Sequence, residues 1–221
     1  NAKKARQLLD EYGFTNTESH VTEWHPMWYA WENAVDANEL GNPNPEKYAT
    51  MRDKFDTMRG PKAAAFVAAA LVRMQDSPLD MANYYTADTN PWGMFDAFSV
   101  PGRVYYAFVA FNQLTKTPNR VAAEQQGAPE PEITACAGLS DDRSRASVLI
   151  SHYDAAPRRV TLQLQNLPLP QPVEAETLVV DSGHELASIS KTVLAAEQSE
   201  LAMDMPDNAV YLVRLGAPVA K

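Results

Sequence analysis

The spacing of apolar residues changes part-way along the chain, and this change limits the available folds more than any other feature. Up to about residue 120, apolar residues recur at the three- and four-residue spacing of helices, interrupted by short strand-like runs. After a segment rich in Gln, Gly, Pro and Glu, the spacing becomes two, as in strands that bury one face. We therefore predict a first part at 1–122, a linker at 123–131 and a second part at 132–221.

The first part alternates between the two kinds of secondary structure. Helices are predicted over 2–12, 62–74 and 102–114, and strands over 18–24 and 80–85. The helix at 62–74 is apolar almost all round, so we expect it to be buried on more than one side. Alternation of this kind is typical of an α/β fold with parallel strands.

The second part has no helical run between its short strand-like segments. The clearest of these is 159–165, in which three apolar side chains alternate with polar ones. Similar runs lie at 133–139, 146–153, 174–181 and 209–215. Short strands at regular spacing predict an all-β unit, an antiparallel β-sandwich.

Composition excludes several classes of function. The 19 Lys and Arg residues against 28 Asp and Glu residues give a net charge of −9. We therefore expect no nucleic acid partner, which would call for a basic patch, and no anionic membrane surface as a partner. The single cysteine, Cys136, rules out an internal disulfide and a thiolate metal cluster. The longest apolar run, 63–72, is too short to span a bilayer.

The chain begins at Asn1 rather than Met, and no signal peptide stands there. We therefore expect it to be part of a longer protein. The composition does not assign a compartment, although a secreted or periplasmic location is favoured.

The strongest candidate for chemistry is the segment 21–26, in which Glu23 ends a short strand and aromatic residues follow. Sugar-cleaving sites use a carboxylate to attack or stabilise an oxocarbenium-like centre. Flat aromatic rings can pack on the apolar faces of sugars. The structural alternative is a solvated Glu23 beside aromatic residues that belong to a core. The aromatic candidates are Trp24, Trp28, Tyr29 and Trp31.

This segment, with Tyr12-Gly13-Phe14 before it, resembles the region around the seventh strand in the (β/α)8 glycoside hydrolases of clan A. It looks like glycoside hydrolase family 39, the group of β-xylosidases and α-L-iduronidases. The segment 101–108 is similar to the motif that opens the last barrel helix in these enzymes. The resemblance implies the C-terminal part of a (β/α)8 TIM barrel followed by an antiparallel β-sandwich. In this scheme 64–74 is the seventh helix, 81–86 the eighth strand and 104–114 the eighth helix.

The same resemblance implies roles for individual residues. Glu23 occupies the position of the catalytic nucleophile in a retaining O-glycoside hydrolase, and the substrate would be an oligosaccharide or glycoside. No cofactor and no metal are expected. The residues expected to bind the sugar are Trp24, His25, Tyr84, Tyr85, Asp88 and Trp92.

The second catalytic group is missing from the sequence. A retaining glycosidase needs two carboxyl groups about 5–5.5 Å apart. In clan A the acid/base is a Glu that follows Asn at the end of the fourth strand. No such step precedes Glu23, and Asn38-Glu39 comes after it in a polar segment. We therefore expect the acid/base in an absent N-terminal barrel portion or in another chain, and we expect the isolated chain to be inactive.

An alternative from a different class remains open. The chain can instead be a non-catalytic carbohydrate-binding or assembly module that keeps the shape of the barrel segment and the sandwich. In that case aromatic residues bind the sugar and Glu23 is dispensable.

Overall fold

The computed structural model describes residues 2–27, 53, 55–90, 92–126, 132–195 and 200–218. Most of the strands follow the helices along the chain, and residues 55–59 are also helical. The helices are α1 (Ala2–Glu11), α3 (Pro61–Met74), α4 (Arg103–Asn112) and the 3-10 helix η2 (Gln113–Lys116). The strands are β1 (His20–Trp24), β2 (Met81–Tyr84), β3 (Asn119–Val121), β4 (Ile133–Leu139), β5 (Arg145–His152), β6 (Arg158–Gln163), β7 (Val173–Val180), β8 (Glu185–Leu194), β9 (Glu200–Met205) and β10 (Ala209–Gly216).

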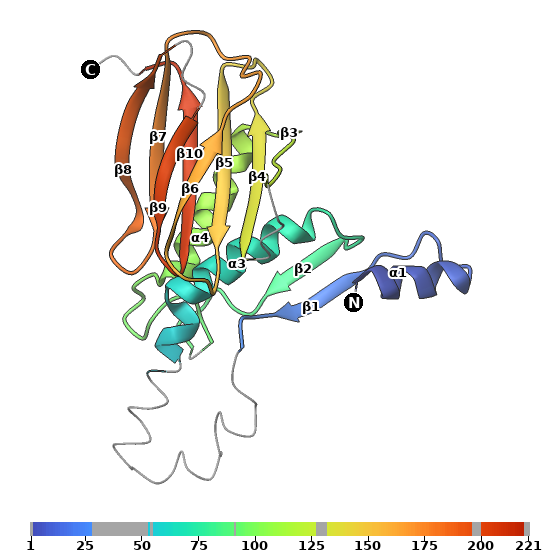
Figure 1. Ribbon diagram of the computed structural model, residues 1–221. Coiled ribbons are helices and arrows are strands. Elements are labelled where there is room, and N and C mark those ends of the chain that lie inside the picture. The colour runs from blue at the N-terminus through green and yellow to red at the C-terminus, as the bar shows by residue number, and fades with distance from the viewer. Residues whose placement is uncertain are drawn as a thin grey trace.

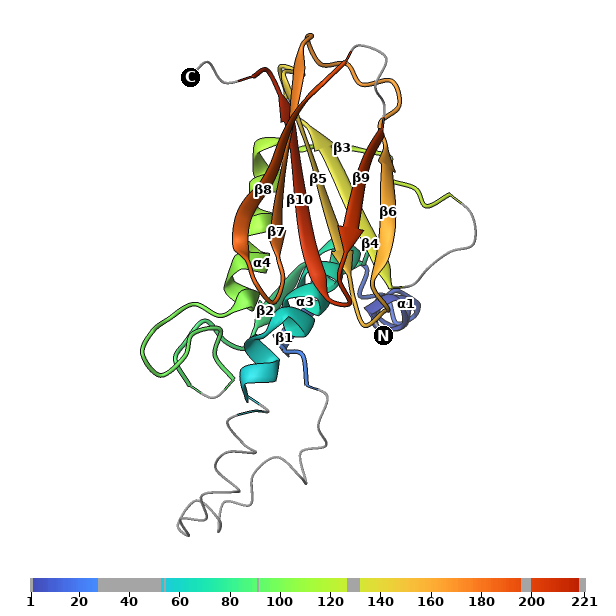
Figure 2. The ribbon, with the colours of Figure 1, turned by 60° about the vertical axis from the view of Figure 1, so that its left-hand side comes forward.

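The largest element is a six-stranded antiparallel sheet with the order β3-β4-β5-β10-β7-β8. Its central strand β10 pairs with β5 on one side and with β7 on the other, so that Leu212 lies opposite both Leu149 and Leu178. The shorter antiparallel pair β6-β9 lies over one face of this sheet (Figure 2). The prediction of antiparallel strands in this part of the chain is confirmed.

The inner strands of the six-stranded sheet are buried on both faces, each face against a different partner. On one face, Leu149, Val210 and Leu212 join the apolar residues of α3 and α4 in a common core. On the other face, Tyr211 and Val213 pack with residues of β6 and β9 in a second core. Period-two alternation explains this division, because successive side chains of a strand point to opposite faces.

The helix α3 crosses the sheet and is buried along most of its length (Figure 1). Gly60 precedes it and Pro61 occupies its first position, where the missing N–H has no helical partner to lose. Its buried residues are mostly alanines, and small side chains let the helix approach both α4 and the sheet closely. The Ser151 hydroxyl of β5 donates to the Ala65 carbonyl at 2.6 Å. The expectation that this helix is buried on more than one side is confirmed.

The helix α1 lies apart from both cores and has no buried residue. Gly13 follows it with φ of 84°, a left-handed conformation that glycine adopts without a steric penalty. The Arg6 guanidinium donates to the carbonyls of Phe14 and Thr17 and so ties the following turn to the helix.

The strand predictions match β4, β5, β6, β7 and β10 to within two residues at their ends. The strands β3, β8 and β9 were not predicted. Nearly all residues of β8, one of the two edge strands of the sheet, are exposed, so its sequence carries no buried face. The strand β3 belongs to the sheet although it precedes the predicted linker, and residues 127–131 of that linker lie outside the described residues.

Within the part of the chain that the structure describes, no helix is both long enough and apolar enough to cross a membrane.

Candidate functional site

The strands β1 and β2 lie side by side as a parallel pair (Figure 1). At their amino ends the Asp80 N–H donates to the Ser19 carbonyl at 2.9 Å, and the Ser19 N–H donates to the Asp80 carboxylate at 2.7 Å. At their carboxyl ends the Tyr85 N–H donates to the Trp24 carbonyl at 3.0 Å. Both carboxyl ends therefore meet at one edge, which is where sites form in folds built from parallel strands.

The register of this pair contains a β-bulge. Val21 lies opposite Ala82, and Trp24 lies opposite Tyr84, so β1 advances three residues where β2 advances two. In a regular strand, positions 21 and 24 would face opposite sides of the pair. The extra residue lets Val21 and Trp24 share the side of Ala82 and Tyr84, and all four side chains are half-buried.

The opposite side of the pair carries the exposed residues. We call it the open face and define it by His20, Thr22, Glu23, Met81 and Asn83, which are all exposed. Because of the bulge, Thr22 and Glu23 together lie opposite the single residue Asn83. No hydrogen bond or ion pair joins Glu23 to any other residue that the structure describes.

The other side of the pair faces the helices and is aromatic. The ring centroids of Trp24 and Tyr84 lie 5.1 Å apart in an edge-to-face arrangement, and Tyr84 lies 5.1 Å from Phe108 of α4. The Trp24 Nε1 and the Tyr84 hydroxyl are buried and have no hydrogen-bond partner in the described part of the chain. Burial raises the pKa of Tyr84 well above its usual range, so this hydroxyl stays protonated. Trp24 and Tyr84 thus form an aromatic layer on the helix side of the pair, opposite the face that carries Glu23.

His25 belongs to the same layer. Its ring centroid lies 5.6 Å from that of Tyr84, and neither ring nitrogen has a partner of standard hydrogen-bond geometry among the described residues. Burial lowers the pKa of His25, and the nearby backbone of Trp92 and Pro26 offsets only part of that effect. The imidazole is therefore neutral at pH 7 and packs on the aromatic layer.

The loop after β2 is held in shape by Asp88. Its carboxylate accepts a hydrogen bond from the Thr89 N–H at 2.6 Å and lies 3.5 Å from the Asn90 side-chain nitrogen. Gly93 closes the loop, because a Cβ at this position would lie 1.8 Å from the Asp88 carbonyl oxygen. Asp88 therefore acts as a local cap of this loop.

Two aromatic residues flank this loop. Tyr85 is 42% exposed beyond the end of β2, and the peptide bond between Tyr85 and Thr86 is cis. Trp92 is half-buried. Its backbone N–H donates to the Asn90 side-chain oxygen at 2.9 Å, and its ring centroid lies 5.7 Å from that of Phe55.

The structure thus separates the predicted site residues into groups. Glu23 lies on the open face, while Trp24, His25 and Tyr84 lie on the helix side. Trp28, Tyr29 and Trp31 lie outside the described residues. The sequence analysis did not single out Asn83, although a polar residue between the half-buried Ala82 and Tyr84 is a sign of a strand with a second, open face.

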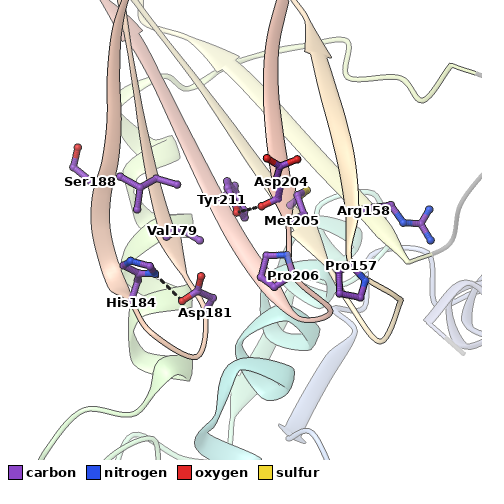
Figure 3. A pocket seen from close by; sticks show the side chains of 11 residues that line it. Pro157, Arg158, Val179, Asp181, His184, Ser188, Asp204, Met205, Pro206 and Tyr211 are labelled. Carbon is purple, nitrogen blue, oxygen red and sulfur yellow. Dashed lines mark hydrogen bonds and ion pairs between the residues drawn. The ribbon is translucent and has the colours of Figure 1, made fainter.

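A separate groove of about 970 Å³ opens on the β-sandwich (Figure 3). Val179, Met205 and Tyr211 line it, and the Tyr211 hydroxyl donates to the Asp204 carbonyl at 2.8 Å. At its edge the His184 Nδ1 lies 2.8 Å from an Asp181 carboxylate oxygen. None of the predicted site residues lines this groove.

In the described ranges, no three His, Cys, Asp or Glu side chains are grouped so that they could hold a metal ion.

The amino-acid sequence matches no family model and no curated protein. Solved structures with a similar fold include several glycoside hydrolases. A glucosidase from Croceicoccus marinus matches with a TM-score of 0.70 at 19% identity, over 99% of this chain and 50% of that one. A glycoside hydrolase family 39 enzyme from Xanthomonas axonopodis pv. citri matches with a TM-score of 0.62 at 12% identity, over 99% and 48%. A family 30 subfamily 8 xylanase from Clostridium acetobutylicum matches with a TM-score of 0.59 at 12% identity, over 92% and 43%.

These likenesses concern the fold. The chain has a fold found in glycoside hydrolases, and it spans about half the length of the enzymes it matches.

Proposed function

We propose that this chain supplies the C-terminal part of the (β/α)8 barrel, and the attached β-sandwich, of a retaining glycoside hydrolase. Glu23 is the nucleophile in this proposal, and the acid/base residue belongs to the rest of the barrel. The family 39 resemblance of the segment around Glu23 and the family 39 structure among the similar folds both support the assignment.

The observation that carries the proposal is the division between the two sides of the β1-β2 pair. Helix α4 covers the side of Trp24 and Tyr84, and Glu23 lies on the opposite side near the carboxyl end of its strand. In a (β/α)8 barrel, helices cover the outside of the strands, and catalytic residues project from the carboxyl ends of the strands. This position of Glu23 supports its proposed role as a catalytic group of such a barrel.

The open face also needs a covering element. Parallel strands are normally buried on both faces, whereas Met81 on this face is 49% exposed. Further strands of a barrel would bury this face and enclose Glu23 in a cleft. The exposed Tyr12 and Phe14, at 77% and 58%, add apolar surface after α1 that suits the same contact.

The chemistry in such a cleft takes two steps. A Glu23 carboxylate oxygen attacks the anomeric carbon and forms a glycosyl ester, while the glycosidic bond breaks and the acid residue protonates the leaving oxygen. Water, deprotonated by the same residue, then attacks the anomeric carbon and releases Glu23 as a carboxylate. No ion pair with a described residue occupies the Glu23 oxygens in advance.

The remaining residues take supporting roles in this proposal. The carboxyl ends of the two strands are held on the helix side by Trp24, Tyr84 and His25. The loop after β2 is shaped by Asp88. Tyr85 is exposed at the edge where the strands end, so its ring is available to a sugar. Trp92 stays a predicted stacking residue.

Replacing Glu23 tests the proposal in the complete protein that carries the whole barrel. Glu23→Ala is expected to lower kcat for aryl glycosides by about 10⁴-fold, the scale seen when one member of a catalytic set is lost. Azide should partly restore turnover, because it replaces the missing nucleophile in the space that Ala leaves. Glu18→Gln is the matched control, since Glu18 is exposed and lies before β1, where it contacts His20. Unchanged activity of Glu23→Ala would overturn the assignment.

A second candidate function is sugar binding or assembly without catalysis. It is favoured by the absence, among the described residues, of a second carboxylate on the open face. This alternative predicts that wild type and Glu23→Gln bind xylo- and arabino-oligosaccharides equally in a calorimetric titration, without turnover in the complete protein. Weaker binding by Glu23→Gln together with turnover by the wild type would reject it.

A further inference from the structure

The bulge in β1 creates a neighbour for Glu23 that a regular strand would not. Two consecutive residues of β1, Thr22 and Glu23, lie opposite the single residue Asn83 of β2. The side chains of Glu23 and Asn83 are both exposed on the same face of the pair. Neighbouring strands lie about 4.7–4.9 Å apart, so the side chains of opposed residues on one face can come into contact.

Asn83 is the residue of the open face best suited to hold a carboxylate. Its amide carries two N–H donors and no charge, so it can bond a carboxylate oxygen without neutralising it. Met81 is apolar, and the His20 ring is already bonded to Glu18 at 2.8 Å. No hydrogen bond in the described part of the chain engages the Asn83 side chain.

We propose that Asn83 becomes a positioning residue for Glu23 once the barrel is complete. The Asn83 amide, which makes no hydrogen bond to Glu23 in the described chain, then donates one to a carboxylate oxygen and leaves the other oxygen aimed at the sugar. This inference rests on the proposed function of Glu23. An error of about 1 Å in the placement of a reacting group can cost about 100-fold in rate, so a donor that fixes one oxygen has a measurable effect.

The juxtaposition itself can be tested in the 221-residue chain without any activity. In the double variant Glu23→Cys/Asn83→Cys, oxidised glutathione should produce a disulfide, because bridged residues need Cα atoms about 4.4–6.8 Å apart. The matched control is Glu23→Cys/Met81→Cys, in which the second thiol lies two residues further along the same face, roughly 6–7 Å away along the strand. Mass spectrometry of the alkylated protein separates crosslinked from free thiols. A bridge in the control but not in the Asn83 variant would overturn the proposal.

The positioning role is tested by kinetics of the complete protein. Asn83→Ala is expected to lower kcat about 10–100-fold with little change in KM, since the group acts on the nucleophile rather than on sugar binding. Asn83→Asp keeps the shape but places a second carboxylate opposite Glu23. It should move the acidic limb of the kcat/KM profile to higher pH, because like charges oppose ionisation. Met81→Ala should retain wild-type kcat and the wild-type profile.

The possible results distinguish the role of Asn83 from the proposed role of Glu23 as the nucleophile. An active wild type with unchanged kcat in Asn83→Ala would overturn the role of Asn83 and leave Glu23 as the nucleophile. An inactive complete protein would overturn the proposed function and the role of Asn83 with it. A fall in kcat without the pH shift in Asn83→Asp would assign Asn83 to the sugar instead, and so also contradict the proposal.

Discussion

The β-sandwich and the β1-β2 pair differ in how many faces of their strands are covered. The six-stranded sheet is covered on one face by α3 and α4 and on the other by β6-β9, so residues such as Leu149 and Leu212 have no exposed surface. The β1-β2 pair is covered on one side by α4, and its other side carries exposed residues that include Glu23 and Asn83. One region is closed within the described chain, and the other leaves one face exposed.

This difference indicates where stability lies and, on the proposed function, where the chemistry lies. A region whose faces are both buried holds the chain together, and substitutions there should be costly. A face that carries polar side chains contributes little to folding and is available for chemistry.

Truncation in the sandwich core should be costly. Leu212 on the central strand β10 is fully buried between the sheet and the helices. Leu212→Ala is expected to lower the free energy of unfolding by about 2–5 kcal/mol, through lost burial and a residual cavity. Thr22→Ala on the open face should change it by no more than about 0.5 kcal/mol. Urea unfolding of both variants measures the contrast, and equal costs would remove the distinction between the two regions.

A smaller loss is expected where α4 meets the turn after β7. The Arg103 guanidinium donates to the Asp181 carbonyl at 3.0 Å and to the Ser182 carbonyl at 3.3 Å, and it pairs with the Glu185 carboxylate. Arg103→Ala should cost about 1–2 kcal/mol, because it leaves these acceptors without their donor.

The control for Arg103 is Arg159→Ala. The Arg159 side chain is 69% exposed and lies 3.5 Å from Asp204, so its loss should cost less than about 0.5 kcal/mol. Thermal unfolding of the two variants provides the test. A larger loss for Arg159→Ala than for Arg103→Ala would contradict the importance of the contact between α4 and the turn.

The smallest effect is a pH dependence from His25. Burial lowers the pKa of His25 in the folded state below 6.5, the pKa of an unperturbed histidine. As the pH falls below 6.5, the folded protein therefore binds fewer protons than the unfolded chain. The free energy of unfolding should therefore decrease as the pH falls below 6.5. Well above pH 6.5, His25 is neutral in both states and adds no pH dependence to stability. His25→Phe should make Tm less sensitive to pH between about 7.5 and 5, which is the range over which histidine titrates. An unchanged or steeper dependence in the variant would show that His25 is not packed in the aromatic layer as described.

The sequence predicted the sandwich better than the site, for a physical reason. Alternation in β6 and the apolar runs of β5 and β10 reflect burial, which governs which residues occur there. The edge strand β8 buries little, so its sequence has no apolar period to detect. Nor does spacing alone show that one face of the sheet packs on helices and the other on β6-β9.

The position of Glu23 at the end of a strand followed from the sequence, but its surroundings did not. The pattern 20–24 contains no sign of the bulge, because a bulge is a property of two paired strands rather than of one. Trp24 is predicted to bind the sugar, and the structure packs its ring beside Tyr84 and Phe108. Its sugar-binding role stays a prediction. Asn83 emerged only when β1 and β2 were paired.

The most direct test of the central claim is to trap the intermediate on Glu23. The complete protein is incubated with dinitrophenyl 2-deoxy-2-fluoro-glycosides of xylose, glucose and arabinose, and its peptides are analysed by mass spectrometry. The account predicts a single peptide carrying the fluorosugar as an ester on Glu23, together with loss of activity. A sugar ester on a different carboxylate, with Glu23 unmodified, would contradict it.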